Sequence, residues 1–317
     1  MDKGHFGRYL SVIFIASIIS AAFLVIVTDD TAAEMYGDYK FFVDAQGRAT
    51  IIGYSGPGGD ITIPAKMLNG TVEYPTVGIG VGAFNGCTSL TTVTIPGSIT
   101  TIGDYAFNGC DHLTSITIPD NVSYIGTYAF EECTSLTSVR VPDNVTAIGY
   151  ATFAYCFSLT SVTIPDSVKT IGGYAFIYCP SLRTITIPES VTAIGERAFF
   201  NCPSLSSITI PSNVTTIGDY VFSMCTSLTS IAFLGLVAPT TVGADWILGT
   251  DAGIRGHAYA ASNFPVPGGV WNGLTMGEVI PISPASDNAM LILVLVIIMA
   301  LVLAVVLFVR RKRKGEK

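Results

Sequence analysis

Seven cysteines are the side chains of this chain best suited to chemistry, because thiols form disulfides, bind metals and act as nucleophiles. Neighbouring cysteines are always 23 residues apart: Cys87, Cys110, Cys133, Cys156, Cys179, Cys202 and Cys225. One thiol per repeated unit places the side chains in parallel, whereas a disulfide needs Cβ atoms that converge to about 3.8 Å. No chelating pair and no histidine column accompanies them. We therefore predict buried free thiols, no metal site and no cofactor.

The histidines and glycine-rich runs form no recognisable catalytic motif. His257, toward the C-terminus, has no nucleophile motif beside it and is predicted to be a residue of a terminal cap. The run 78–82 (GIGVG) resembles a phosphate-binding loop, but its glycines fall within a repeated unit. The run 53–57 (GYSGP) has proline where a nucleophile elbow has its last glycine. We expect no enzymatic activity.

Binding must then use the positions that the 23-residue period leaves variable. The outward position of the predicted strands carries threonine, with arginine in one unit: Thr94, Thr117, Arg140, Thr163, Thr186 and Thr209. Threonine is typical of a solvated strand face, so this column has an interpretation without any ligand. The alternative is a ligand-binding face formed by Thr117, Arg140 and Thr163 and centred on the arginine.

A second candidate surface is aromatic. Three successive units place aromatic side chains at variable positions where other units carry Asn, Gly or Glu: Tyr155, Phe157, Tyr178 and Phe200. Stacked units would bring these side chains together, and an exposed apolar patch is typical of a binding interface. Local adjustment of packing explains the same residues, and both interpretations stay open.

Four Asn-x-Ser/Thr sequons, at Asn69, Asn121, Asn144 and Asn213, could accept glycans. The last three share one position of the repeat. Asparagine also satisfies backbone groups in turns, so the repeat explains these residues as well.

The elements that position these residues follow from the repeat itself. Phenylalanine, leucine, glycine and proline recur with the same 23-residue period as cysteine, which is typical of a solenoid. In one unit, Ile116 and Ile118 alternate with polar residues as in a short strand, and Pro119 ends it. Ile125, Ala129 and Cys133 then follow at i, i+4 and i+8, the spacing of a helix face. We predict an α/β solenoid in which each turn is a strand, a bend and a short helix.

The unit Ile-Pro-x-x-Val-x-x-Ile-Gly-x-x-Ala-Phe-x-x-Cys-x-x-Leu-x-x-Ile resembles the BspA-type leucine-rich repeat over residues 61–233. Departures are Thr152 and Val221 at the alanine position, and an insertion of nine residues between Pro64 and Pro96. The resemblance implies cell-surface proteins that act in adhesion and in binding to host or matrix molecules.

The regions on either side of the repeats are predicted to cap the solenoid, whose end turns must cover their apolar faces. Residues 34–60 contain a hairpin pattern that turns at Gln46-Gly47, and residues 234–280 form the C-terminal cap. Residues 281–288 are a polar linker.

The two ends of the chain predict its localisation. Residues 1–33 read as a signal peptide or a retained N-terminal anchor. The uncharged run 289–309 is long enough for a transmembrane helix, and the basic tail 310–317 places the C-terminus in the cytoplasm. We expect a single-pass membrane protein with its repeats outside the cell.

Charge excludes one class of partner. Between residues 34 and 288 there are eight Lys and Arg against 19 Asp and Glu, a net charge of −11. Nucleic acid is therefore not expected as a partner. The sequence predicts recognition of an extracellular protein or glycan ligand. The alternative is a structural element of the cell envelope that associates with itself.

Overall fold

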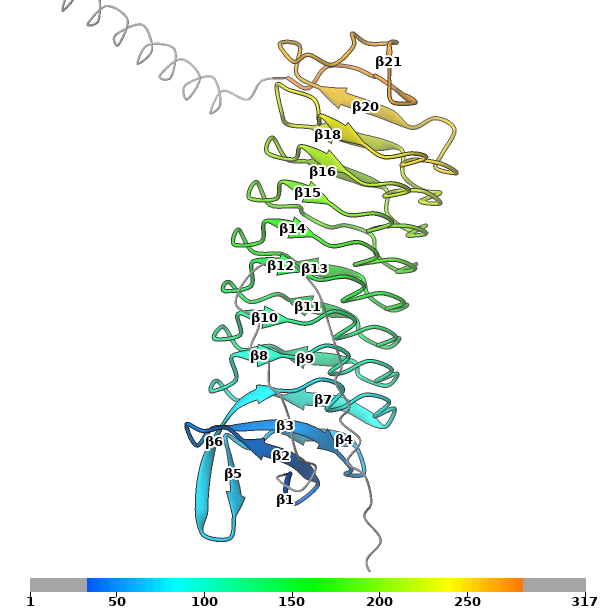
Figure 1. The fold of residues 1–317 in the computed structure, drawn as a ribbon. Helices are drawn as coiled ribbons and strands as arrows, with labels where there is room; N and C mark the ends of the chain where they lie inside the picture. The colour runs from blue at the N-terminus through cyan, green and yellow to red at the C-terminus, as the bar shows by residue number, and fades with distance from the viewer. Residues whose placement is uncertain (1–32, 282–317) are drawn as a thin grey trace, which may run out of the picture. The chain divides into compact units, whose positions relative to one another are not determined.

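The computed structural model describes residues 33–281, in which the chain winds into a parallel β-solenoid of about nine turns (Figure 1). Most repeats contribute two strands on adjacent sides of the turn, and the repeat around residues 184–187 contributes only the second. Strands of the first series are β7 (Leu90–Thr94), β9 (Ser115–Thr117), β11 (Ser138–Arg140), β13 (Ser161–Thr163), β16 (Ser207–Ile210), β18 (Ser230–Phe233) and β20 (Arg255–Ala258). Strands of the second series are β8 (Thr101–Ile102), β10 (Tyr124–Ile125), β12 (Ala147–Ile148), β14 (Thr170–Ile171), β15 (Ala193–Ile194), β17 (Thr216–Ile217) and β19 (Thr241–Val242).

The register of these strands follows the 23-residue period of the sequence. Ser138 pairs with Ser161 and Ile148 with Ile171, in parallel and 23 residues apart. Because every strand lies directly over its equivalent, each position of the repeat becomes a column along the solenoid. The predicted strand at Ile116 is confirmed as β9.

The third side of each turn is where the α/β prediction is wrong, because residues 33–281 contain no helix. Alternate amides there donate to the next turn, as Phe130 N does to Thr152 O at 2.9 Å. The amides between them donate three residues back, as Cys133 N does to Phe130 O. Tyr128 and Glu132 have φ angles of 58° and 57°, which an α-helix does not allow. Two left-handed residues four positions apart thus produce the spacing that suggested a helix.

The predicted membrane localisation is also corrected. Within residues 33–281 there is no helix that is long and apolar enough to cross a bilayer. The run 289–309, the N-terminal segment up to residue 32 and the tail 310–317 lie outside the described residues.

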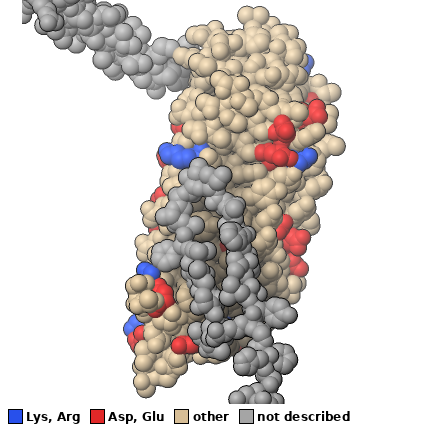
Figure 2. Space-filling view, viewed as in Figure 1, with Lys and Arg blue, Asp and Glu red and all other residues tan. Residues whose placement is uncertain are grey.

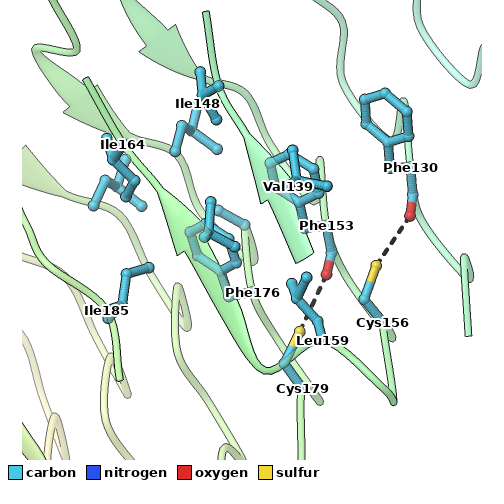
Figure 3. Packing of buried hydrophobic residues seen from close by; sticks show 14 of the residues in the cluster. Phe130, Val139, Ile148, Phe153, Cys156, Leu159, Ile164, Phe176, Cys179 and Ile185 are labelled. Atoms are coloured by element: carbon cyan, nitrogen blue, oxygen red, sulfur yellow. Dashed lines mark hydrogen bonds between the residues drawn. The ribbon is translucent and has the colours of Figure 1, made fainter. Parts of the chain in front are cut away.

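The core is a set of columns of identical side chains, the clearest being seven stacked phenylalanines. Rings of successive turns lie 5.0–5.5 Å apart and within 11° of parallel from Phe84 to Phe222. Beside them, Cys156 Sγ donates to Phe130 O and Cys179 Sγ to Phe153 O, each at 3.2 Å (Figure 3). All seven thiols are free and six are buried, which confirms the predicted free thiols.

Each end of the phenylalanine column is covered by other aromatic residues. The N-terminal part contains β1 (Glu34–Tyr36), β2 (Tyr39–Val43), β3 (Ala49–Tyr54), β4 (Gly59–Thr62), β5 (Lys66–Asn69) and β6 (Val72–Ile79). From it, Tyr39 and Tyr54 pack on Phe84. The C-terminal part adds β21 (Val270–Trp271) and β22 (Leu274–Thr275), and Trp246 packs edge-on against Phe222.

Candidate recognition surface

Arg140 lies exposed on the first strand series, in β11, with Thr163 beside it in register in β13. Thr117 is exposed in β9. The guanidinium of Arg140 donates to Asp120 Oδ1 at 2.5 Å and to Asp143 Oδ2 at 3.1 Å. These carboxylates raise the pKa of Arg140 and partly neutralise it. A ligand at this face would have to compete with two carboxylates of the protein for the cation.

The third side carries a group of packed aromatic residues that is separate from the main core. Tyr128, Tyr155, Tyr174, Tyr178 and Phe200, here called the aromatic cluster, pack on the buried side chains of Ala151, Ala154 and Ile177. The ring centroids of Tyr155 and Tyr178 lie 5.2 Å apart and stacked, and Tyr178 meets Phe200 edge-on at 5.8 Å. The structure thus brings together three of the four predicted aromatic residues. The fourth, Phe157, is 47% exposed and lies outside the cluster.

Two tyrosines of the cluster occupy a backbone position that is left-handed in successive turns. Tyr155 and Tyr178 have φ angles of 57° and 54°, in the left-handed region. Gly86 and Gly109 occupy the same column with φ angles of 70° and 67°. A left-handed conformation costs a non-glycine residue about 1 kcal/mol or more, so tyrosine is not the residue that this backbone favours. Glu132, Asn201 and Met224 adopt the same conformation in this column, so the left-handed backbone belongs to the repeat and accepts several kinds of side chain.

Sequence reasoning missed a ladder of tyrosines at the edge of the cluster. Rings contact from turn to turn, Tyr105 with Tyr128 at 4.7 Å, Tyr128 with Tyr150 at 5.4 Å and Tyr150 with Tyr174 at 5.0 Å. Burial and the neighbouring tyrosines raise the pKa of Tyr128 to about 12. The signal in the sequence was the period itself, because residues 105, 128, 174 and 220 are all tyrosine at the same position of the unit.

A cation ends this ladder. The Cζ atom of Arg197 lies 5.5 Å from the ring centroid of Tyr174 and 4.7 Å from that of Tyr220. Its Nη1 also donates to Glu196 Oε1 and to Tyr174 Oη. Arg197 is thus held by a carboxylate and by two rings of its own chain.

The opposite boundary of the cluster is acidic. Glu131 and Glu132 occupy the turn that precedes Ala154 and Tyr155. Asn108 Nδ2 donates to Glu131 Oε2 at 2.7 Å, while burial and the neighbouring Glu132 raise the pKa of Glu131. Neither carboxylate has an ion-pair partner within residues 33–281.

Three of the sequon asparagines contribute to the stack. Their Nδ2 atoms donate to carbonyl oxygens of the preceding turn: Asn121 to Gly97, Asn144 to Asp120 and Asn213 to Glu189, at 2.6–2.7 Å. Asn69 ends β5. All four side chains are exposed, and glycosylation stays a prediction.

His257 lies in β20 near the C-terminal end, where its Nδ1 is hydrogen-bonded to Glu278 O at 2.8 Å. The described residues hold no group of three His, Cys, Asp or Glu side chains that could bind a metal ion.

This architecture defines a solenoid of leucine-rich repeats. The family model for the BspA type leucine rich repeat region matches six copies over residues 66–179 and 146–242, and the chain belongs to this family. Proteins of this kind are typically not enzymes. A search among curated proteins returned no match.

Three solved structures illustrate what this chain is similar to. A leucine rich cell surface protein from Faecalibacterium prausnitzii is 26% identical, with 83% of this chain and 98% of that chain covered and a TM-score of 0.53. A leucine rich repeat protein from T. pallidum is 28% identical, with coverages of 67% and 86% and a TM-score of 0.47. One from Bacteroides ovatus is 22% identical, with coverages of 78% and 76% and a TM-score of 0.48.

Proposed function

We propose that this protein recognises a macromolecular ligand, preferably a protein, and that the aromatic cluster on the third side of the solenoid is the contact surface. The observation that carries the proposal is the set of half-buried rings of Tyr155, Tyr178 and Phe200, which pack outside the main core. Aromatic side chains are enriched at the centres of protein interfaces. The name of the F. prausnitzii protein supports a setting at the cell surface.

The strand face is less favourable as the contact surface. Arg140 is already paired with Asp120 and Asp143, so binding there would exchange ion pairs rather than add one. Its neighbours Thr117 and Thr163 offer single hydroxyl groups, which discriminate little between ligands. Substitutions on this strand face therefore serve as the control for substitutions in the aromatic cluster.

The test is binding of the full-length protein to an array of extracellular-matrix proteins, cell-wall polysaccharides and glycans, with light scattering on the same sample. The variant Tyr155→Asn with Tyr178→Asn removes two rings, and asparagine already occupies this column at Asn201 with a φ of 55°. We expect it to weaken binding about tenfold or more, with little loss of stability.

The matched control is Arg140→Gln with Thr163→Ala on the strand face, which we expect to leave binding unchanged. Loss of binding in the control but not in the tyrosine variant would assign the site to the strand face. Self-assembly of the protein without saturable binding to any probe would instead favour the structural alternative.

A further inference from the structure

The order of side chains along one column of the third side suggests the chemistry of the ligand. Glu132, Tyr155 and Tyr178 occupy the same position in three successive turns. Backbone hydrogen bonds fix this alignment, because Glu132 N donates to Ala154 O and Tyr155 N to Ile177 O, both at 2.9 Å. A carboxylate is therefore followed directly by two stacked rings.

Glu132 and its neighbour Glu131, in the turn before Tyr155, have no ion-pair partner within residues 33–281. Glu131 accepts a neutral amide from Asn108, and burial together with Glu132 raises its pKa, which is the response of a carboxylate that lacks a cation. Residues 33–281 contain eight Lys and Arg against eighteen Asp and Glu. The part of the surface that is visible in Figure 2 is largely uncharged, with small groups of Asp and Glu and a few Lys or Arg side chains. A cation from outside would compensate the charge of this pair.

The boundary of the cluster at Arg197 has no uncompensated charge that could attract a ligand. Arg197 there is paired with Glu196 and lies between the rings of Tyr174 and Tyr220. The surface is thus asymmetric, with uncompensated negative charge at one boundary and a cation already engaged at the other.

We propose that the aromatic cluster binds a short extended peptide segment of a partner protein that carries Lys or Arg at one end and apolar side chains after it. The basic side chain lies against Glu131 and Glu132 and over the face of the Tyr155 ring that is turned away from Tyr178, where carboxylates and an aromatic ring attract it together. The apolar side chains pack on Tyr178 and Phe200. This inference rests on the proposed function and adds the chemistry of the ligand.

The spacing of the turns sets the length of the segment. Three steps between stacked turns cover about 14 Å, and an extended chain rises about 3.3 Å per residue. Since alternate side chains of an extended peptide point to the same side, the basic residue and two apolar residues should stand at positions i, i+2 and i+4.

The test uses the full-length protein and a labelled peptide, Arg-Ser-Leu-Ser-Phe, with Glu-Ser-Leu-Ser-Phe as its charge-reversed partner, measured by fluorescence anisotropy. We expect the arginine peptide to bind about tenfold more tightly, and salt to weaken this preference. The variant Glu131→Gln with Glu132→Gln keeps an acceptor for Asn108 and should remove the preference. Asp166→Asn, an exposed carboxylate at a strand exit, is the matched control and should keep it.

Equal binding of the two peptides, no saturable binding of the arginine peptide, or an unchanged preference in the glutamine variant would each overturn the inference. These results are separate from the fate of the proposed function. Suppose that Tyr155→Asn with Tyr178→Asn abolishes binding of a ligand from the array while the glutamine variant binds it normally. The aromatic cluster is then the contact surface, and the inference of a basic ligand is wrong.

Discussion

Asn144 shows how a single side chain joins two turns. Its Nδ2 donates to Asp120 O at 2.7 Å, while Ser167, one turn later in the same column, donates from Oγ to Val145 O at 2.6 Å. Both side chains donate to a backbone carbonyl of the preceding turn, asparagine to one 24 residues earlier and serine to one 22 residues earlier. The column is polar because each turn must satisfy carbonyl groups of the turn before it.

Replacing Asn144 with alanine should therefore lower the free energy of unfolding by about 1 kcal/mol, the typical contribution of one hydrogen bond. Asn144→Ser should recover much of this loss, because serine is a native occupant of the column. Urea denaturation followed by circular dichroism measures both. Equal destabilisation by alanine and serine would show that the hydrogen bond is not the cause.

The thiols give a second prediction at this scale. Burial raises the pKa of Cys110 to about 12 and holds the pKa of Cys133 and Cys156 well above the usual range. Since the thiolate is the reactive form, a thiol reagent near neutral pH should label at most the half-buried Cys87 in the native protein and all seven thiols after denaturation. Rapid labelling of several native thiols would contradict this packing.

The raised pKa of Cys110 also makes the stability of the protein depend on pH. A thiol with a raised pKa in the folded state favours folding while it is protonated. Its contribution is complete below the ordinary pKa of about 9 and is lost as the pH rises toward about 12. The denaturation midpoint should accordingly fall in this alkaline range, and it should fall less in a Cys110→Ala variant relative to that variant's own midpoint at neutral pH.

At the scale of elements, each turn leaves its second strand at a glycine that lies on the glycine of the turn before it. A Cβ atom on Gly172 would lie 2.7 Å from Gly149 C, closer than real contacts allow. On Gly149 itself, the nearest backbone atom would be 3.6 Å away and Thr152 Oγ1 3.1 Å away. The two glycines share a column, yet only at Gly172 does the neighbouring backbone leave no room for a Cβ atom.

We expect Gly172→Ala to lower stability by about 1–3 kcal/mol, the usual cost of overpacking, and Gly149→Ala to cost clearly less. The pair controls for helix and strand propensity, because the substitution and the position in the repeat are the same. Thermal denaturation of both variants tests the difference. Equal losses would mean that intrinsic preference for glycine, rather than the close approach, decides this position.

At the scale of the molecule, the phenylalanine column makes the solenoid a one-dimensional stack. Phe153 contacts the rings of Phe130 and Phe176 at 5.5 Å on either side, and no ring in the column contacts one beyond its neighbours. Stability in such a stack is the sum of turns and of the contacts between adjacent turns.

Phe153→Ala should cost about 3–5 kcal/mol through the cavity that it leaves. Hydrogen exchange should rise most in the turn that contains residue 153 and in its two neighbours, and less toward the caps. A uniform rise in exchange along residues 33–281 would show instead that the stack unfolds as one cooperative unit.

The repeat, its register and the buried columns could all be read from the sequence, because a 23-residue period leaves stacking as the way to bury the recurring Phe, Leu, Ile and Cys side chains. The free thiols and the grouping of Tyr155, Tyr178 and Phe200 followed from the same period. These features depend on which residues share a column, and the sequence states that directly.

The third side of the turn was decided by tertiary structure. Apolar residues at i, i+4 and i+8 indicate a helix only if the amides bond within the turn, and here alternate amides bond to the next turn instead. Glycines at 82, 86 and 109 indicate positions with a left-handed backbone. In later turns these positions carry residues such as tyrosine, glutamate and methionine, from which a left-handed backbone is not expected. The pairing of Arg140 with Asp120 and the hydrogen bond of Glu131 with Asn108 likewise join side chains 20 or more residues apart, which meet only when the turns stack.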